Sequence, residues 1–201
     1  MYSVLSAMAL FAFVGSISPG PVNVMATYAG ARYGWRKASI QVLGASLAFV
    51  LVVMVCGVTL SGMSEQVPVI VPVMRWIGSA YLLYLALRIL LLPGLDLQQS
   101  AEVSSAGLLG QGALVQLLNP KAWIFASSGV SLYVLNQANL AQALGWFCLI
   151  ALVVCFTGVG IWAVLGQSLV SWLNSRQRQR LFQFILAAML TVSIVLIWME
   201  G

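Results

Sequence analysis

The polar residues that could bind a ligand gather around prolines inside long apolar stretches. The first group is Pro19, Gly20, Pro21 and Asn23. The second group is Asn119, Pro120 and Lys121. Proline removes a backbone N–H and clashes with the preceding turn, so each group predicts a break in a helix. A break leaves backbone carbonyls and amides without helical partners, and such groups can bind a ligand.

The chemistry these groups suggest is the binding of a zwitterion. Helix N-termini attract a carboxylate, and carbonyls at helix C-termini attract an ammonium group. Asn23 and Asn119 would add side chains that both donate and accept hydrogen bonds. Lys121 is the one cation well inside an apolar stretch, where an ionisable side chain is costly and is a functional candidate. Two alternatives stay open: the prolines only kink their helices, or Lys121 only reaches the interface or neutralises carbonyls freed by Pro120.

The composition predicts an integral membrane protein. The chain has 201 residues, of which 62% are hydrophobic and 6% charged, whereas a soluble domain has about a quarter charged residues. It has no histidine and four acidic residues, which argues against a metal site, a cofactor or an acid–base enzyme. We therefore predict no catalytic residue. The net charge of +5 lies in loops beside apolar runs, where it sets membrane topology and does not indicate nucleic-acid binding.

The apolar stretches predict an all-α fold with six transmembrane helices in one transporter domain, 1–201. The six segments are 3–28, 39–61, 70–92, 107–133, 142–166 and 180–199. A polar connection at 93–107 divides the chain into halves of about 1–95 and 105–201. Each half holds a broken span, an unbroken span and a third span, so the second half must enter the membrane upside down. This layout predicts two inverted three-helix repeats, with helices one and four broken at proline.

Basic residues predict the orientation in the bilayer. They concentrate in the first and fifth predicted loops, at Arg32, Arg36, Lys37, Arg176, Arg178 and Arg180. Because basic loops favour the cytoplasm, the odd-numbered loops are expected there and both termini on the periplasmic side. Both breaks then lie near the middle of the bilayer. Two interrupted segments at corresponding places in two halves point to the binding site of a transporter.

Three ordered stretches resemble the LysE/RhtB family of bacterial amino-acid exporters. They are SPGPVNVMATYAGARYGWRKASIQVLGASLAF, RWIGSAYLLYLALRIL and GALVQLLNPKAWIFASSGVSLYV. The resemblance implies proton-driven export of amino acids or close derivatives across the inner membrane, with the Pro-Gly-Pro and Asn-Pro-Lys residues at the signature positions. A homo-oligomer remains an open alternative.

Two positions depart from the family pattern. Val22 follows Pro-Gly-Pro where many members have a polar residue, and Phe49 stands where many carry an acidic one. The run GASLAF is closer to the branch that exports cysteine and O-acetylserine. Rival functions are a passive pore, a metal-ion exporter, or a thiol-based membrane enzyme using Cys56, Cys148 and Cys155, which we interpret as small hydrophobic residues.

Overall fold

In the computed structural model, the described residues are 2–62, 67–91 and 103–199, and they are helical without any strand. This confirms the predicted all-α fold. The helices are α1 Tyr2–Ile17, α2 Pro21–Tyr33, α3 Trp35–Gly62, α4 Val67–Leu91, α5 Ser105–Leu117, α6 Pro120–Tyr133, α7 Leu140–Ser168, the 3-10 helix η1 Leu169–Ser171, and α8 Arg176–Met199. Most of the predicted connection at 93–107 lies outside the described residues, which resume at residue 103.

Both predicted helix breaks are present. The first separates α1, which ends at Ile17, from α2, which begins at Pro21. The two helices bend by 62° at this point. The second separates α5, which ends at Leu117, from α6, which begins at Pro120. Proline is well placed at the start of α2 and α6, because the first amides of a helix have no intrahelical partner.

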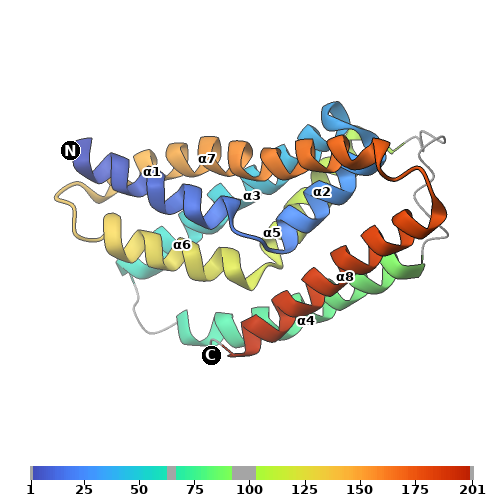
Figure 1. Cartoon of the computed structure of the whole chain (residues 1–201). Coiled ribbons are helices and arrows are strands. Elements are labelled where there is room, and N and C mark those ends of the chain that lie inside the picture. Colours follow the sequence, from blue (N-terminus) through green and yellow to red (C-terminus); the bar gives the residue numbers. More distant parts are fainter. Residues whose placement is uncertain (1, 63–66, 92–102, 200–201) are drawn as a thin grey trace.

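Two long helices organise the rest of the molecule (Figure 1). The continuous helices α3 and α7 pack against each other, and each also packs against the broken pair of the other half: α3 against α5 and α6, α7 against α1 and α2. Helices α4 and α8 form a separate pair along one side of this body. The two breaks therefore lie between the halves of the chain.

Glycines allow the closest helix crossings. A Cβ atom on Gly30 would collide with the carbonyl oxygen of Ala163, which brings α2 directly onto the backbone of α7. A Cβ atom on Gly44 would likewise collide with the carbonyl oxygen of Leu109, where α3 crosses α5. Small residues of this kind let helix backbones approach each other in membranes. One such crossing positions the helix after the first break, and the other positions the helix before the second.

The membrane-crossing segments are only partly those predicted. Among the described residues, three helices are long and apolar enough to cross a membrane: Trp35–Leu60, Leu140–Ser171 and Arg176–Met199. The bent pair Ser3–Ile17 and Pro21–Tyr33 would make a fourth span. The six-span count is therefore not established. The predicted spans at 107–133 and 70–92 are not among these segments. The first is divided between α5 and α6, and the second corresponds to α4, whose side chains up to residue 74 lie outside the description.

The basic helix ends gather at one end of the molecule. Arg32 is in the last turn of α2, Arg88 is in the last turn of α4, and Arg176 begins α8. These ends lie on the right in Figure 1, whereas α1 begins and α8 ends toward the left. The fold therefore separates a basic end from the end that holds the first turn of α1.

Candidate functional site

Side chains of the protein donate hydrogen bonds to the carbonyl groups at the end of α1. The Asn23 amide Nδ2 donates to the carbonyl of Ser16 at 3.0 Å and to that of Ser18 at 2.7 Å. The indole Nε1 of Trp162, on α7, donates to the carbonyl of Ile17 at 3.0 Å. These hydrogen bonds hold the first break in place, at carbonyls where the sequence predicts binding of a ligand's ammonium group.

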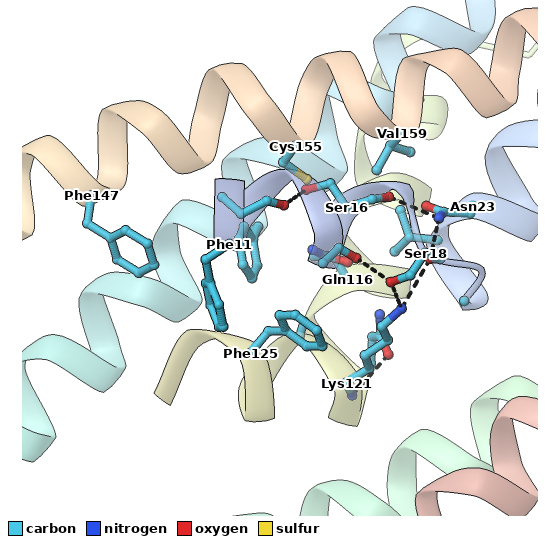
Figure 2. Close-up of a pocket in the computed structure, with 17 residues that line it drawn as sticks. Phe11, Ser16, Ser18, Asn23, Gln116, Lys121, Phe125, Phe147, Cys155 and Val159 are labelled. Carbon is cyan, nitrogen blue, oxygen red and sulfur yellow. Dashed lines mark hydrogen bonds between the residues drawn. The ribbon is translucent and has the colours of Figure 1, made fainter. Parts of the chain in front are cut away.

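Lys121 joins the two breaks. Its ammonium Nζ donates to the hydroxyl of Ser18 at 2.7 Å, to the carbonyl of Ser18 at 3.1 Å and to the carbonyl of Pro19 at 3.2 Å. Figure 2 shows this side chain reaching from α6 to the end of α1. The ammonium group thus lies at the negative end of the α1 dipole. It donates to carbonyls of the other half of the chain.

At the second break, the backbone groups are paired with side chains that lie close to them in the sequence. The Asn119 side-chain oxygen Oδ1 accepts from the backbone N–H of Lys121 at 3.2 Å, which makes Asn119 the N-cap of α6. The Trp123 indole Nε1, one turn into the same helix, donates to the carbonyl of Leu117 at 2.8 Å. Asn119 is 5% exposed. Its side chain therefore stabilises the start of α6 from a buried position.

The start of α2 has no such cap. Gly20 is its N-cap residue, and no side chain among the described residues caps this helix. The first helical hydrogen bond runs from the N–H of Val24 to the carbonyl of Gly20, so the amides of Val22 and Asn23 precede it. A Cβ atom on Gly20 would lie 3.5 Å from Lys121 Nζ. An ammonium group and the positive end of a helix therefore meet here, and together they can bind a carboxylate.

A cavity of about 50 Å³ lies between the two breaks and is bounded by α3 and α7. Its polar wall is formed by residues of the breaks, and its apolar wall includes Phe11, Phe125 and Phe147 (Figure 2). The rings of Phe11 and Phe125 are 5.4 Å apart. A volume of this size holds a few water molecules, so an amino acid would need the lining side chains to move.

A second cavity, of about 200 Å³, lies on the α8 side of Lys121. It is lined by the first break, by Asn119 and Lys121, and by Ser193, Leu196 and Ile197 of α8. Lys121 therefore borders both cavities. Movement of this one side chain would change the wall between them.

The structure brings most of the predicted site residues together. Gly20, Asn23, Asn119 and Lys121 line the smaller cavity, and Pro19 and Pro21 line the larger. Pro120 lines neither cavity; its ring carbons lie near the Cβ position of Gly78 on α4.

Sequence reasoning missed three polar contributors: Ser18, Gln116 and Trp162. Each is a polar or indole-bearing residue inside an apolar stretch, and the first two are within three positions of a break. That proximity was a usable signal for Ser18 and Gln116. Trp162 gave no such signal, because it is 145 positions from its partner.

Phe49, one of the two positions that depart from the pattern of the resembled family, lines the smaller cavity. Among the described residues there is no group of three or more His, Cys, Asp or Glu side chains that could hold a metal ion. The polar groups that line the smaller cavity are amides, carbonyls, serine hydroxyls, the Cys155 thiol and one ammonium group.

Comparison with known proteins assigns the family. The family model of the LysE type translocator matches residues 13–199. The cysteine/O-acetylserine efflux protein of Salmonella typhimurium strain LT2 is 33% identical over 167 residues, which cover 81% of this chain and 82% of the relative. The protein of the same name from Escherichia coli strain K12 is 27% identical over 200 residues, 98% of each chain. No solved structure matches the chain. The match along nearly the whole chain, around a site built from both signature motifs, means that this protein belongs to the LysE type translocator family.

Proposed function

We propose that the protein exports a small amino acid, or a close derivative, from the bacterial cytoplasm across the inner membrane. The observation that carries this proposal is the meeting of the Lys121 ammonium group with the uncapped start of α2 at the cavity between the breaks. This arrangement suits the carboxylate that every amino acid carries. The names of the relatives make L-cysteine and O-acetylserine the first substrates to test.

The architecture we propose is six spans in two inverted repeats. Its support is the reciprocal packing, in which α3 packs on α5 and α6 while α7 packs on α1 and α2. The pairs α3 with α7 and α4 with α8 would lie across the pseudo-two-fold axis. The basic helix ends at Arg32, Arg88 and Arg176 favour a cytoplasmic location for that end, with both termini periplasmic.

Transport would proceed by alternating access around Lys121. The cavity of about 50 Å³ is too small to accept an amino acid without rearrangement, and the cavity of about 200 Å³ lies on the other side of the same lysine. Rocking of one half against the other would enlarge each in turn. Export would be coupled to protons, and Lys121 is the ionisable residue among the described ones lining both cavities.

Everted membrane vesicles test this proposal directly. Vesicles containing the wild-type protein should accumulate labelled L-cysteine or O-acetyl-L-serine above the external concentration when the proton gradient is imposed. Lys121→Met should abolish accumulation, because the carboxylate loses its ammonium partner. Lys37→Met is the matched control, since Lys37 is the other lysine of the chain and lies near the start of α3, away from both cavities.

Three results would contradict the proposal. Equilibration without accumulation would indicate a passive pore. Full activity of Lys121→Met at normal membrane abundance would show that the Lys121 ammonium group does not bind the substrate. Accumulation of no amino acid in a complete panel would reject export of this substrate class.

A further inference from the structure

A buried amide oxygen in the smaller cavity has no donor in the described part of the protein. Gln116 is in the last turn of α5, directly before the second break, and is 5% exposed. No donor of the described residues reaches its side-chain oxygen Oε1. Gln116 lines the same cavity as Gly20 and Lys121 (Figure 2). A buried acceptor without a partner is destabilising, so such a group at a cavity points to a ligand that donates.

The chemistry of this oxygen matches the ammonium group of an amino acid. Lys121 and the first amides of α2 suit a carboxylate, but they cannot receive an ammonium group. The carbonyls of Ser16 and Ile17 already accept from Asn23 and Trp162. An amide oxygen is a strong acceptor, and a charged donor strengthens the bond.

We propose that Gln116 Oε1 accepts a hydrogen bond from the α-ammonium group of the substrate. This assignment rests on the proposed function and deepens it, because it makes the site specific for the zwitterion and not merely for a carboxylate. The aromatic wall of Phe11, Phe125 and Phe147 then surrounds the substrate side chain. Because this wall offers no charge, the site favours small uncharged side chains.

Binding of two compounds that differ only in the amino group tests the assignment. L-Cysteine and 3-mercaptopropionate share the carboxylate and the thiol, and only cysteine carries the ammonium group. Their affinities for the purified full-length protein can be measured by calorimetry in detergent with a reductant. In Gln116→Met, the Kd for L-cysteine should rise about 10- to 100-fold, the equivalent of one hydrogen bond to a charged group. The Kd for 3-mercaptopropionate should not change.

Gln41 provides the matched control. Its side-chain oxygen is also buried without a donor in the described residues, and it is 3% exposed. It borders a cavity of only about 10 Å³ between α2, α3, α5 and α7, and it does not line the cavity of the proposed site. Gln41→Met should therefore leave both affinities as they are in the wild type.

A second variant keeps the test decisive if Gln116→Met does not fold. Gln116→Glu retains an acceptor oxygen at the same position and should keep the preference for L-cysteine over 3-mercaptopropionate. The assignment is overturned if Gln116→Met leaves cysteine affinity unchanged, if both ligands weaken equally, or if Gln116→Glu abolishes the preference. Failure of the wild-type protein to bind either compound would instead reject cysteine as the substrate, and the assignment with it.

Discussion

The two helix breaks look alike in sequence but are stabilised in different ways. Each has a proline and an asparagine, yet Asn23 donates to carbonyls at the end of α1 while Asn119 accepts from an amide at the start of α6. The first break is held by Asn23 and also by two groups from the other half of the chain, Trp162 and Lys121. The second is held by its own neighbours, Asn119 and Trp123.

This difference supports the binding surface that we propose. At the second break the helix start is already capped, so it offers less to an anion. At the first break, the carbonyls at the end of α1 already accept hydrogen bonds from side chains. The start of α2, in contrast, is not capped by a described side chain. In the proposed site, the first break therefore offers backbone amides to the substrate, and the second contributes the side chains of Lys121 and Gln116, which line the same cavity.

The largest expected effect comes from the crossings that position each break. Gly30→Val would drive α2 away from α7 at the first break, and Gly44→Val would drive α3 away from α5 at the second. Because the colliding atoms belong to backbone, relief requires whole helices to shift, at a cost of about 3 kcal/mol or more. Both variants should lose folded protein in thermal unfolding and membrane-abundance measurements.

Exposed glycines provide the control for these crossings. A Cβ atom on Gly145 or Gly110 would meet nothing within 4 Å. Gly145→Val and Gly110→Val should be present at wild-type levels. If Gly30→Val matched them, the close approach of α2 to α7 would be wrong.

The next largest expected effect is a difference in stability between variants of the two asparagines. Asn23→Asp replaces a donor to two carbonyls with a negatively charged acceptor. The Ser16 carbonyl then loses its side-chain donor, at about 1–3 kcal/mol, while the Ser18 carbonyl keeps its hydrogen bond from Lys121. Asn119→Asp keeps the capping oxygen and should be nearly neutral, since Asp is as good an N-cap as Asn. Thermal unfolding in detergent should therefore show a large loss for Asn23→Asp and a small change for Asn119→Asp. Equal losses would mean that the two breaks are not held differently.

The smallest effect separates the two tryptophans. Trp162→Phe and Trp123→Phe each remove one indole N–H from one carbonyl, at a similar cost of about 1–3 kcal/mol. Only Trp162 links α7 to the first break, so its loss should also lower the rate of export in vesicles. Trp123→Phe should reduce stability while leaving the export rate per folded molecule unchanged. A larger export defect in Trp123→Phe than in Trp162→Phe would mean that the contact important for export lies at the second break.

The position of both breaks could be predicted because proline acts locally. A missing N–H and a clash with the preceding turn require no distant partner, and α2 and α6 begin at Pro21 and Pro120 accordingly. The meeting of the two motifs was also expected from the symmetry of the layout. The partners of Lys121 could not be predicted, because this side chain reaches residues about a hundred positions away.

Composition and local pattern alone determined that this chain is an apolar helical protein with two interruptions and a basic end. Backbone hydrogen bonding explains this, because each segment must satisfy its own polar groups wherever proline does not prevent it. Only the tertiary structure decided which side chain pairs with each backbone group that a break leaves without a helical partner. That choice depends on helices packing across the two halves, and it left the start of α2 and the amide of Gln116 facing a cavity.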